Sequence, residues 1–131
     1  MSLKFYKCSI CGNIVCKIED SGLPLTCCGR QMTELRSRST DGSLEKHVPV
    51  FSIMGDTVYV QVGTLPHPME KLHHIQFIAI ETNRGFHVRR MDEMNEPVAQ
   101  FKINEDETLV AVYELCNLHG LFESHKEGEK E

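Results

Sequence analysis

From residue 46 onward the chain alternates short apolar segments with polar residues, and this pattern restricts the fold more than any other feature. Val58, Val60 and Val62 recur at every second position, as on one face of a strand. The preceding Met54-Gly55-Asp56-Thr57 places glycine first in the centre of a hairpin turn. Further apolar segments cover residues 75–80, 86–88, 98–103 and 109–115. Strands at roughly ten-residue spacing without a convincing helix predict a mainly β protein with an immunoglobulin-like β-sandwich.

The first 36 residues have a different character, because they are rich in cysteine. Cys8 and Cys11 form a Cys-x-x-Cys knuckle followed by a Gly-Asn turn, and Cys27 and Cys28 supply two adjacent thiols. Four thiolates suit tetrahedral zinc or iron, and so small a unit needs a metal to supplement its core. We therefore predict a metal-binding domain over residues 1–36, a polar linker over 37–43 and a β-sandwich domain over 44–131. Cys16 is interpreted as a small hydrophobe in a short strand, with a redox-active thiol or an intersubunit crosslink as the alternatives.

Composition restricts the cellular setting and the partners. No apolar stretch has the length of a signal peptide or membrane span, so a cytoplasmic protein without membrane contact is expected. In that reducing compartment, six cysteines favour metal binding over the alternative of three disulfides. The chain carries 14 basic and 19 acidic residues, with no basic stripe interleaved with aromatics, which argues against nucleic acid. Residues 123–131 are interpreted as a solvated tail after the last strand.

A second group of metal-binding residues lies where the predicted strands meet loops. It consists of Cys116 and four of the seven histidines: His47, His67, His73 and His119. Five donors exceed the four of structural zinc, whereas imidazole with one sulfur donor suits iron. Five protein ligands leave one octahedral position open. If the imidazoles share a plane, the thiolate is the axial ligand opposite the open position. It then directs electron density toward whatever binds there. The absence of a substrate cleft in this pattern favours a very small substrate, and a net charge of −5 means that an anion would need a local cation.

These motifs together resemble the desulfoferrodoxin family of two-iron superoxide reductases over nearly the whole chain. The first four cysteines are similar to a desulforedoxin domain. The other matching motifs are Glu45-Lys46-His47-Val48-Pro49, His67-Pro68-Met69 with His73 following, and Cys116-Asn117-Leu118-His119-Gly120. The order and spacing of these motifs make the resemblance specific.

The resemblance implies a role for each residue. His47, His67, His73 and His119 are implied as equatorial ligands of a catalytic ferrous iron, with Cys116 as the axial ligand. Superoxide would take one electron there and leave as hydrogen peroxide after two protonations. Lys46 would attract the anion, and Glu45 would ligate the ferric state. Cys8, Cys11, Cys27 and Cys28 would hold a rubredoxin-type iron, with zinc as the alternative. A rubredoxin-like electron donor and a homodimer are also implied.

Some residues depart from the family pattern or lie outside it. His74 stands where an aromatic residue, usually Tyr, is expected, and we interpret it as a non-ligand because neighbouring strand residues face opposite ways. His87 and His125 are expected on the surface, and Lys71 is expected to be an ordinary solvated lysine. Three other functions are compatible with the metal sites: a superoxide dismutase, a non-catalytic two-iron electron carrier or redox sensor, and a structural zinc protein.

Overall fold

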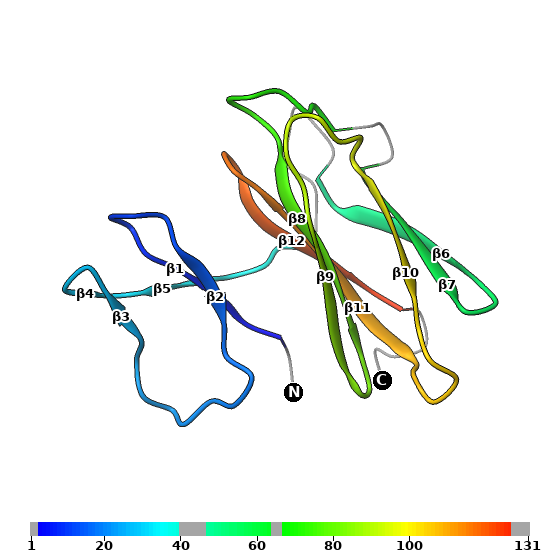
Figure 1. The fold of residues 1–131 in the computed structure, drawn as a ribbon, viewed down its shortest axis with the longest axis horizontal. Helices are drawn as coiled ribbons and strands as arrows, with labels where there is room; N and C mark the ends of the chain where they lie inside the picture. Colours follow the sequence, from blue (N-terminus) through cyan, green and yellow to red (C-terminus); the bar gives the residue numbers. More distant parts are fainter. Residues whose placement is uncertain (1–2, 40–46, 64–66, 127–131) are drawn as a thin grey trace. The chain divides into compact units, whose positions relative to one another are not determined.

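The structure is a computed structural model that describes residues 3–39, 47–63 and 67–126. Every regular element in these ranges is a β-strand, and they contain no helix that could span a membrane (Figure 1). The chain divides into two compact units, Met1–Arg36 and Ser37–Glu131. Each unit is described by itself.

The first unit contains two small antiparallel sheets. One has the strand order β2-β1-β5, and the other pairs β3 with β4. Their bounds are β1 Phe5–Lys7, β2 Ile14–Cys16, β3 Thr26–Cys27, β4 Arg30–Gln31 and β5 Thr33–Leu35. Only Phe5, Cys8 and Met32 are buried among the described apolar residues of this unit, so its core is small, as its length predicts.

The β3–β4 hairpin explains how two adjacent cysteines are accommodated. Cys27 pairs with Arg30 at the end of the ladder, which leaves Cys28 and Gly29 as the two central turn residues. Both have positive φ, 55° and 73°. This is the backbone of a two-residue hairpin turn in which both central residues are left-handed. The reversal of direction between Cys27 and Cys28 permits both sulfurs to approach the same point.

The second unit is a β-sandwich, as predicted. Its two antiparallel sheets have the orders β10-β7-β6 and β12-β11-β8-β9 (Figure 1). Their bounds are β6 Pro49–Met54, β7 Thr57–Val62, β8 Ile75–Thr82, β9 Gly85–Arg90, β10 Val98–Lys102, β11 Leu109–Cys116 and β12 Gly120–His125. The β6–β7 turn has Gly55 at φ 61° in its first central position, as the sequence predicts.

The core of the sandwich forms between the sheets because alternate side chains of each strand face inward. Val58, Val60 and Val62 of β7 are at most 3% exposed, and they share one cluster with Ile78 and Ile80 of β8. Fully burying one such side chain contributes about 1.5–3 kcal/mol. Cys116 belongs to the same cluster, so a predicted metal ligand is fixed by the core itself.

The prediction of a solvated tail is wrong for residues 123–125, because they belong to a strand that the sequence did not reveal. β12 pairs with β11 from Cys116↔Gly120 to Ala111↔His125. Its Ser124 hydroxyl also donates a 2.8 Å hydrogen bond to the carbonyl of Pro49 in β6. Glu123 is half-buried, although its charge suggested solvent. Residues 127–131 lie outside the described part.

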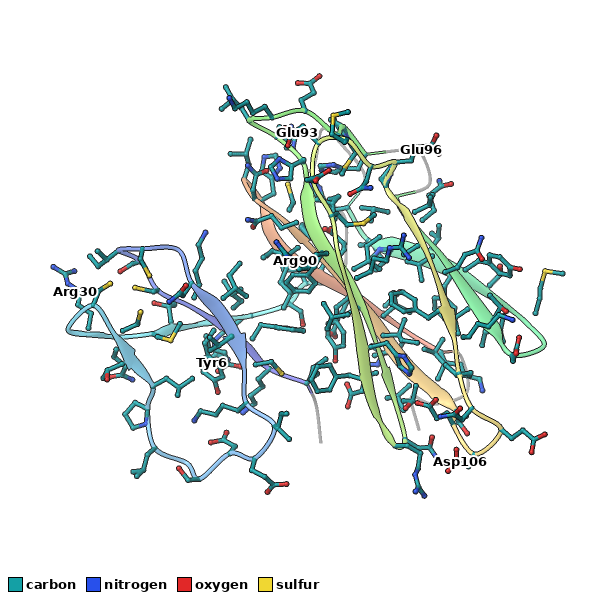
Figure 2. The ribbon with its side chains drawn as sticks, viewed as in Figure 1. Tyr6, Arg30, Arg90, Glu93, Glu96 and Asp106 are labelled. Atoms are coloured by element: carbon teal, nitrogen blue, oxygen red, sulfur yellow. The ribbon has the colours of Figure 1, made fainter. Side chains whose placement is uncertain are left out.

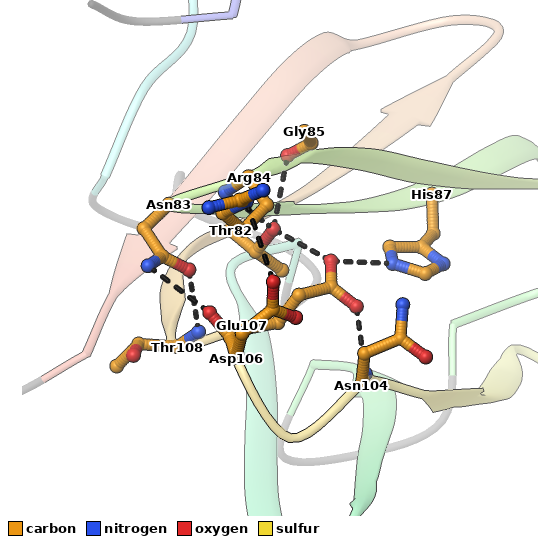
Figure 3. Close-up of polar contacts among 9 residues, drawn as sticks. All are labelled: Thr82, Asn83, Arg84, Gly85, His87, Asn104, Asp106, Glu107 and Thr108. Carbon is orange, nitrogen blue, oxygen red and sulfur yellow. Dashed lines mark hydrogen bonds and ion pairs between the residues drawn. The ribbon is translucent and has the colours of Figure 1, made fainter.

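A polar network centred on Glu107 closes one end of the sandwich (Figure 3). The carboxylate accepts hydrogen bonds from the backbone N–H of Asn104 and the Thr82 hydroxyl, both at 2.8 Å, and lies 3.1 Å from His87 Nε2. The backbone N–H of Asn104, then Thr82, then His87, lower the pKa of Glu107 to about 2. His87, predicted as a surface residue, is half-buried in this network.

Glu107→Gln is expected to destabilise the protein by about 2 kcal/mol at pH 7, because it removes hydrogen bonds to a charged acceptor. The folded pKa lies below the unfolded value, so this stabilisation is present above the unfolded pKa of 4.5 and is lost as pH falls toward about 2. Denaturant titration of both proteins should show the difference shrinking over that range. A constant difference down to pH 2 would contradict the role of the carboxylate.

The matched control is Asp106→Asn. Asp106 lies on the same turn, and its side chain makes an exposed 3.5 Å ion pair with Arg84, which is expected to contribute less than about 0.5 kcal/mol.

Candidate metal centres

The first cluster brings together the four cysteines that the sequence predicts. The sulfurs of Cys8, Cys11, Cys27 and Cys28 all lie within 4.8 Å of one another. In Figure 2 the sulfur atoms of this unit gather near the labelled Arg30, on the β3–β4 hairpin. The Cys8 sulfur accepts hydrogen bonds from the backbone N–H groups of Ile10 and Cys11, at 3.4 and 3.5 Å. The Asn13 amide donates to the Cys27 sulfur at 3.5 Å.

The chemistry of this cluster fits a cation. Hydrogen bonds from the backbone N–H groups of Cys11 and Ile10 lower the pKa of Cys8 to about 6. Hydrogen bonding with the sulfurs of Cys11, Cys8 and Cys27 raises the pKa of Cys28 to about 12. Thiols packed this closely cannot all ionise unless a positive ion compensates their charge. Four convergent sulfurs therefore fit a tetrahedral iron or zinc ion.

The second cluster lies where strands of the sandwich end. His47 precedes β6, His67 and His73 precede β8, Cys116 is the last residue of β11, and His119 precedes β12. The donor atoms of His47, His67, His73 and Cys116 all lie within 4.8 Å of one another. His119 Nδ1 lies 3.1 Å from His47 Nε2 and 3.8 Å from Cys116 Sγ. The structure therefore brings all five predicted donors together.

The four imidazoles form a closed ring of neighbours. Ring centroids are 4.8 Å apart for His47–His67, His67–His73 and His47–His119, and 5.2 Å apart for His73–His119. Every neighbouring pair meets edge to face, with interplanar angles between 63° and 83°. This arrangement allows each ring to direct one nitrogen toward a common centre, as a set of four imidazole ligands requires.

Hydrogen bonding and burial prepare individual donors. His67 Nδ1 lies 2.7 Å from the carbonyl oxygen of Pro68, and since a carbonyl only accepts, Nδ1 carries the proton and Nε2 retains its lone pair. His47, His67 and Cys116 are at most 4% exposed, whereas His119 is exposed. The cluster is thus held by the core yet not sealed from solvent. Imidazoles with one thiolate suit iron.

A β-bulge helps to place Cys116. Leu115 pairs with Phe77, but Cys116 pairs with Ile75, so Gln76 is an extra residue on β8. Bulges bend a strand and redirect side chains, and they are common beside functional sites. The irregularity lies between Cys116 and the loop that carries His73, at the position where two strands must deliver ligands to one centre.

Asn117 connects the two loops that carry these ligands, and the sequence analysis did not single it out. Its side-chain oxygen accepts a 2.9 Å hydrogen bond from the backbone N–H of His74, and its amide nitrogen donates to the Leu72 carbonyl at 3.1 Å. Its own backbone N–H donates to the His74 carbonyl at 3.1 Å. The contacts lie on both sides of His73. The only available sequence signal was that Asn117 stands between two ligands.

The remaining predicted residues fall outside these clusters or outside the described structure. Glu45 and Lys46 lie outside the described residues. The His74 ring lies 3.0 Å from the Glu70 carbonyl, and His74 precedes β8, so the alternation argument for its direction does not apply. Cys16 lies on β2, and its thiol donates a 3.8 Å hydrogen bond to the Lys17 carbonyl.

The chain is similar to known proteins over nearly its full length. Residues 39–125 match the Desulfoferrodoxin family, and residues 2–35 match the desulfoferrodoxin N-terminal domain. A desulfoferrodoxin homolog of Archaeoglobus fulgidus is 38% identical over 93% of this chain and 96% of its own length.

Solved structures of superoxide reductases also align with this chain. The superoxide reductase of Treponema pallidum aligns with a TM-score of 0.83 and 25% identity, covering 94% of this chain and 98% of the other. The superoxide reductase of Giardia intestinalis aligns with a TM-score of 0.56 and 30% identity, covering 64% and 99%.

Asn117→Ala is expected to weaken metal binding at the second cluster by about 10- to 100-fold, because it releases His73 and Cys116 from their shared support. Anaerobic titration with ferrous iron would measure the change. Asn83→Ala is the matched control, since the Asn83 side chain also makes two hydrogen bonds, to the backbone of Thr108 and Asp106, which join the turn after β8 to the loop before β11. The two variants should lose similar stability. Equal iron affinity in both would contradict a positioning role for Asn117.

Proposed function

This chain belongs to the desulfoferrodoxin family, and we propose that it is a superoxide reductase, which converts superoxide to hydrogen peroxide. The observation that carries the proposal is the closed ring of His47, His67, His73 and His119 beside Cys116. These five side chains would hold the catalytic iron. The first cluster, Cys8, Cys11, Cys27 and Cys28, would hold a further iron, with zinc as the alternative at that site.

The donor set favours reduction of the substrate. Iron bound by these five side chains would supply one electron to superoxide. The thiolate of Cys116 would donate electron density to the bound iron, which favours transfer of an electron from the iron to the substrate. Since Cys116 is 1% exposed and belongs to the hydrophobic core, its environment limits access of water to the sulfur. The direction of electron donation distinguishes this proposal from a dismutase, which must also oxidise superoxide.

The substrate is a small anion, and the chain is acidic overall, with a net charge of −5. Attraction must therefore come from a local cation, and we assign this role to Lys46, adjacent to the ligand His47. Lys46 would also order the water that delivers protons. Glu45 would ligate iron after the electron has left. Each turnover consumes one superoxide, one electron and two protons and yields one hydrogen peroxide.

The electron must be replaced from outside the chain. We propose a rubredoxin-like protein as the donor, with the four-cysteine centre as a relay. A homodimer in the cytoplasm is the proposed working form. None of the six cysteines, all of which lie in the described ranges, forms a disulfide, and this fits a reducing compartment.

The products of the reaction test the function directly. The iron-loaded protein, reduced and mixed anaerobically with a known amount of superoxide, is expected to yield one hydrogen peroxide per superoxide without stoichiometric oxygen. Oxygen at half the amount of superoxide would indicate a dismutase. Failure of azide or cyanide to perturb the spectrum of the iron at the four-histidine site, together with no peroxide, would indicate an electron carrier.

Lys46→Ala is expected to slow the second-order reaction with superoxide by about tenfold at low ionic strength and to flatten its salt dependence, because electrostatic steering depends on unscreened charge. Pulse radiolysis over a range of salt concentrations would measure both effects. Lys71→Ala is the matched control, since Lys71 is an exposed lysine in the loop between His67 and His73. Equal rates for both variants at low salt would remove Lys46 from the mechanism.

A further inference from the structure

Residues 37 and 38 extend the ligand-bearing sheet from outside the recognised motifs. The backbone N–H of Arg38 donates to the Leu121 carbonyl at 3.0 Å, and the Arg38 carbonyl accepts from the backbone N–H of Glu123 at 2.8 Å. These bonds form a parallel bridge between Arg38 and Phe122 of β12. The Ser37 hydroxyl also donates to the Glu123 carboxylate at 2.7 Å. A segment that the sequence predicts as linker is thus fixed three residues beyond His119.

The Arg38 side chain reaches the turn that carries His119. Its Nη2 donates a hydrogen bond to the backbone carbonyl of His119. The intervening Gly120 has a φ of 95°, and a Cβ at that position would lie 3.7 Å from the same nitrogen. The positive φ favours glycine at this turn, while a contact of 3.7 Å would be an ordinary van der Waals distance.

The same guanidinium is linked to a second imidazole through Phe122. Its Cζ lies 4.5 Å from the centroid of the Phe122 ring, and that ring stacks on His47 with centroids 4.7 Å apart and an interplanar angle of 14°. Phe122 and His47 are 2% and 4% exposed. Stacking of a buried aromatic ring restricts the plane in which His47 can lie.

We propose that Arg38 is a positioning residue of the second metal centre. It fixes His119 through the backbone carbonyl and His47 through the Phe122 ring, and the facing nitrogens of these two imidazoles are 3.1 Å apart. The charge of Arg38 favours the less positive, reduced form of the bound metal. The inference rests on the proposed function in one respect, which is that the bound metal is iron.

Three variants separate geometry from charge. Arg38→Met removes both, and Arg38→Lys retains the charge without the planar fork. Phe122→Leu removes the ring that contacts both Arg38 and His47, and it leaves the charge and the hydrogen bond to His119 in place. Arg38→Met is expected to bind ferrous iron at least tenfold more weakly, to shift the thiolate charge-transfer band of the ferric protein and to lower its midpoint potential. Arg38→Lys should have a midpoint potential close to that of the parent protein, because the charge remains. Its charge-transfer band should stay shifted, because the planar fork is lost. Phe122→Leu combined with Arg38→Met should cost less than the sum of the separate effects, because both act through His47.

Arg84→Met is the matched control, since Arg84 is exposed and its 3.5 Å ion pair with Asp106 lies at the end of β8 remote from the ligands. It should leave iron affinity, spectrum and potential unchanged. Far-ultraviolet circular dichroism and denaturant titration report whether the sandwich of each variant is otherwise intact.

The inference fails if Arg38→Met matches the parent protein in iron affinity, spectrum and potential. If Arg38→Met does not fold, Arg38→Lys with parental affinity and spectrum overturns the positioning role equally well. These measurements need no superoxide. If the parent protein fails to reduce superoxide, the proposed function is refuted, but the role of Arg38 is not. If the Arg38 variants match the parent protein, the role of Arg38 is refuted, but the proposed function is not.

Discussion

The structure of the second unit depends on the pairing of β11 with both β8 and β12. One register joins Cys116 to Gly120 of β12, and another joins it to Ile75 of β8. The same strand supplies Leu109, Val112 and Cys116 to the hydrophobic core. Apolar burial along β11 therefore fixes the position of the thiolate donor, and the two neighbouring strands bring His73 and His119 to it. Stability and ligand placement are properties of one ladder.

The two metal centres differ in how much of their geometry exists before a metal binds. In the first unit few apolar residues are buried, and the cysteines are held by short turns and hydrogen bonds to sulfur. Much of the folding free energy of such a unit comes from the metal itself. In the second unit a large core is already present, so the imidazoles and the thiolate are organised by packing. Removal of metal should accordingly affect the first unit more than the second.

Features that depend on residue type and local spacing could be predicted from the sequence. Period-two alternation identified β7, and the glycine at position 55 identified the β6–β7 turn, because both signals arise within a few neighbouring residues. The donors of both clusters were found because cysteine and histidine have few alternative uses in such positions. β12 was missed since Glu123 and Ser124 resemble a solvated tail, and only pairing with β11 reveals the strand. Asn117, Arg38 and Phe122 depend on contacts distant in sequence, which no local pattern encodes.

Asn117 binds the loop before β8 on both sides of His73, and it lies next to Cys116 in the chain. Neither loop can open far without breaking bonds to the other. Local opening is usually cooperative within such a bonded unit. The two ligands should therefore leave the metal together, so that release of iron from this centre would follow a single kinetic phase rather than successive loss of one ligand after another.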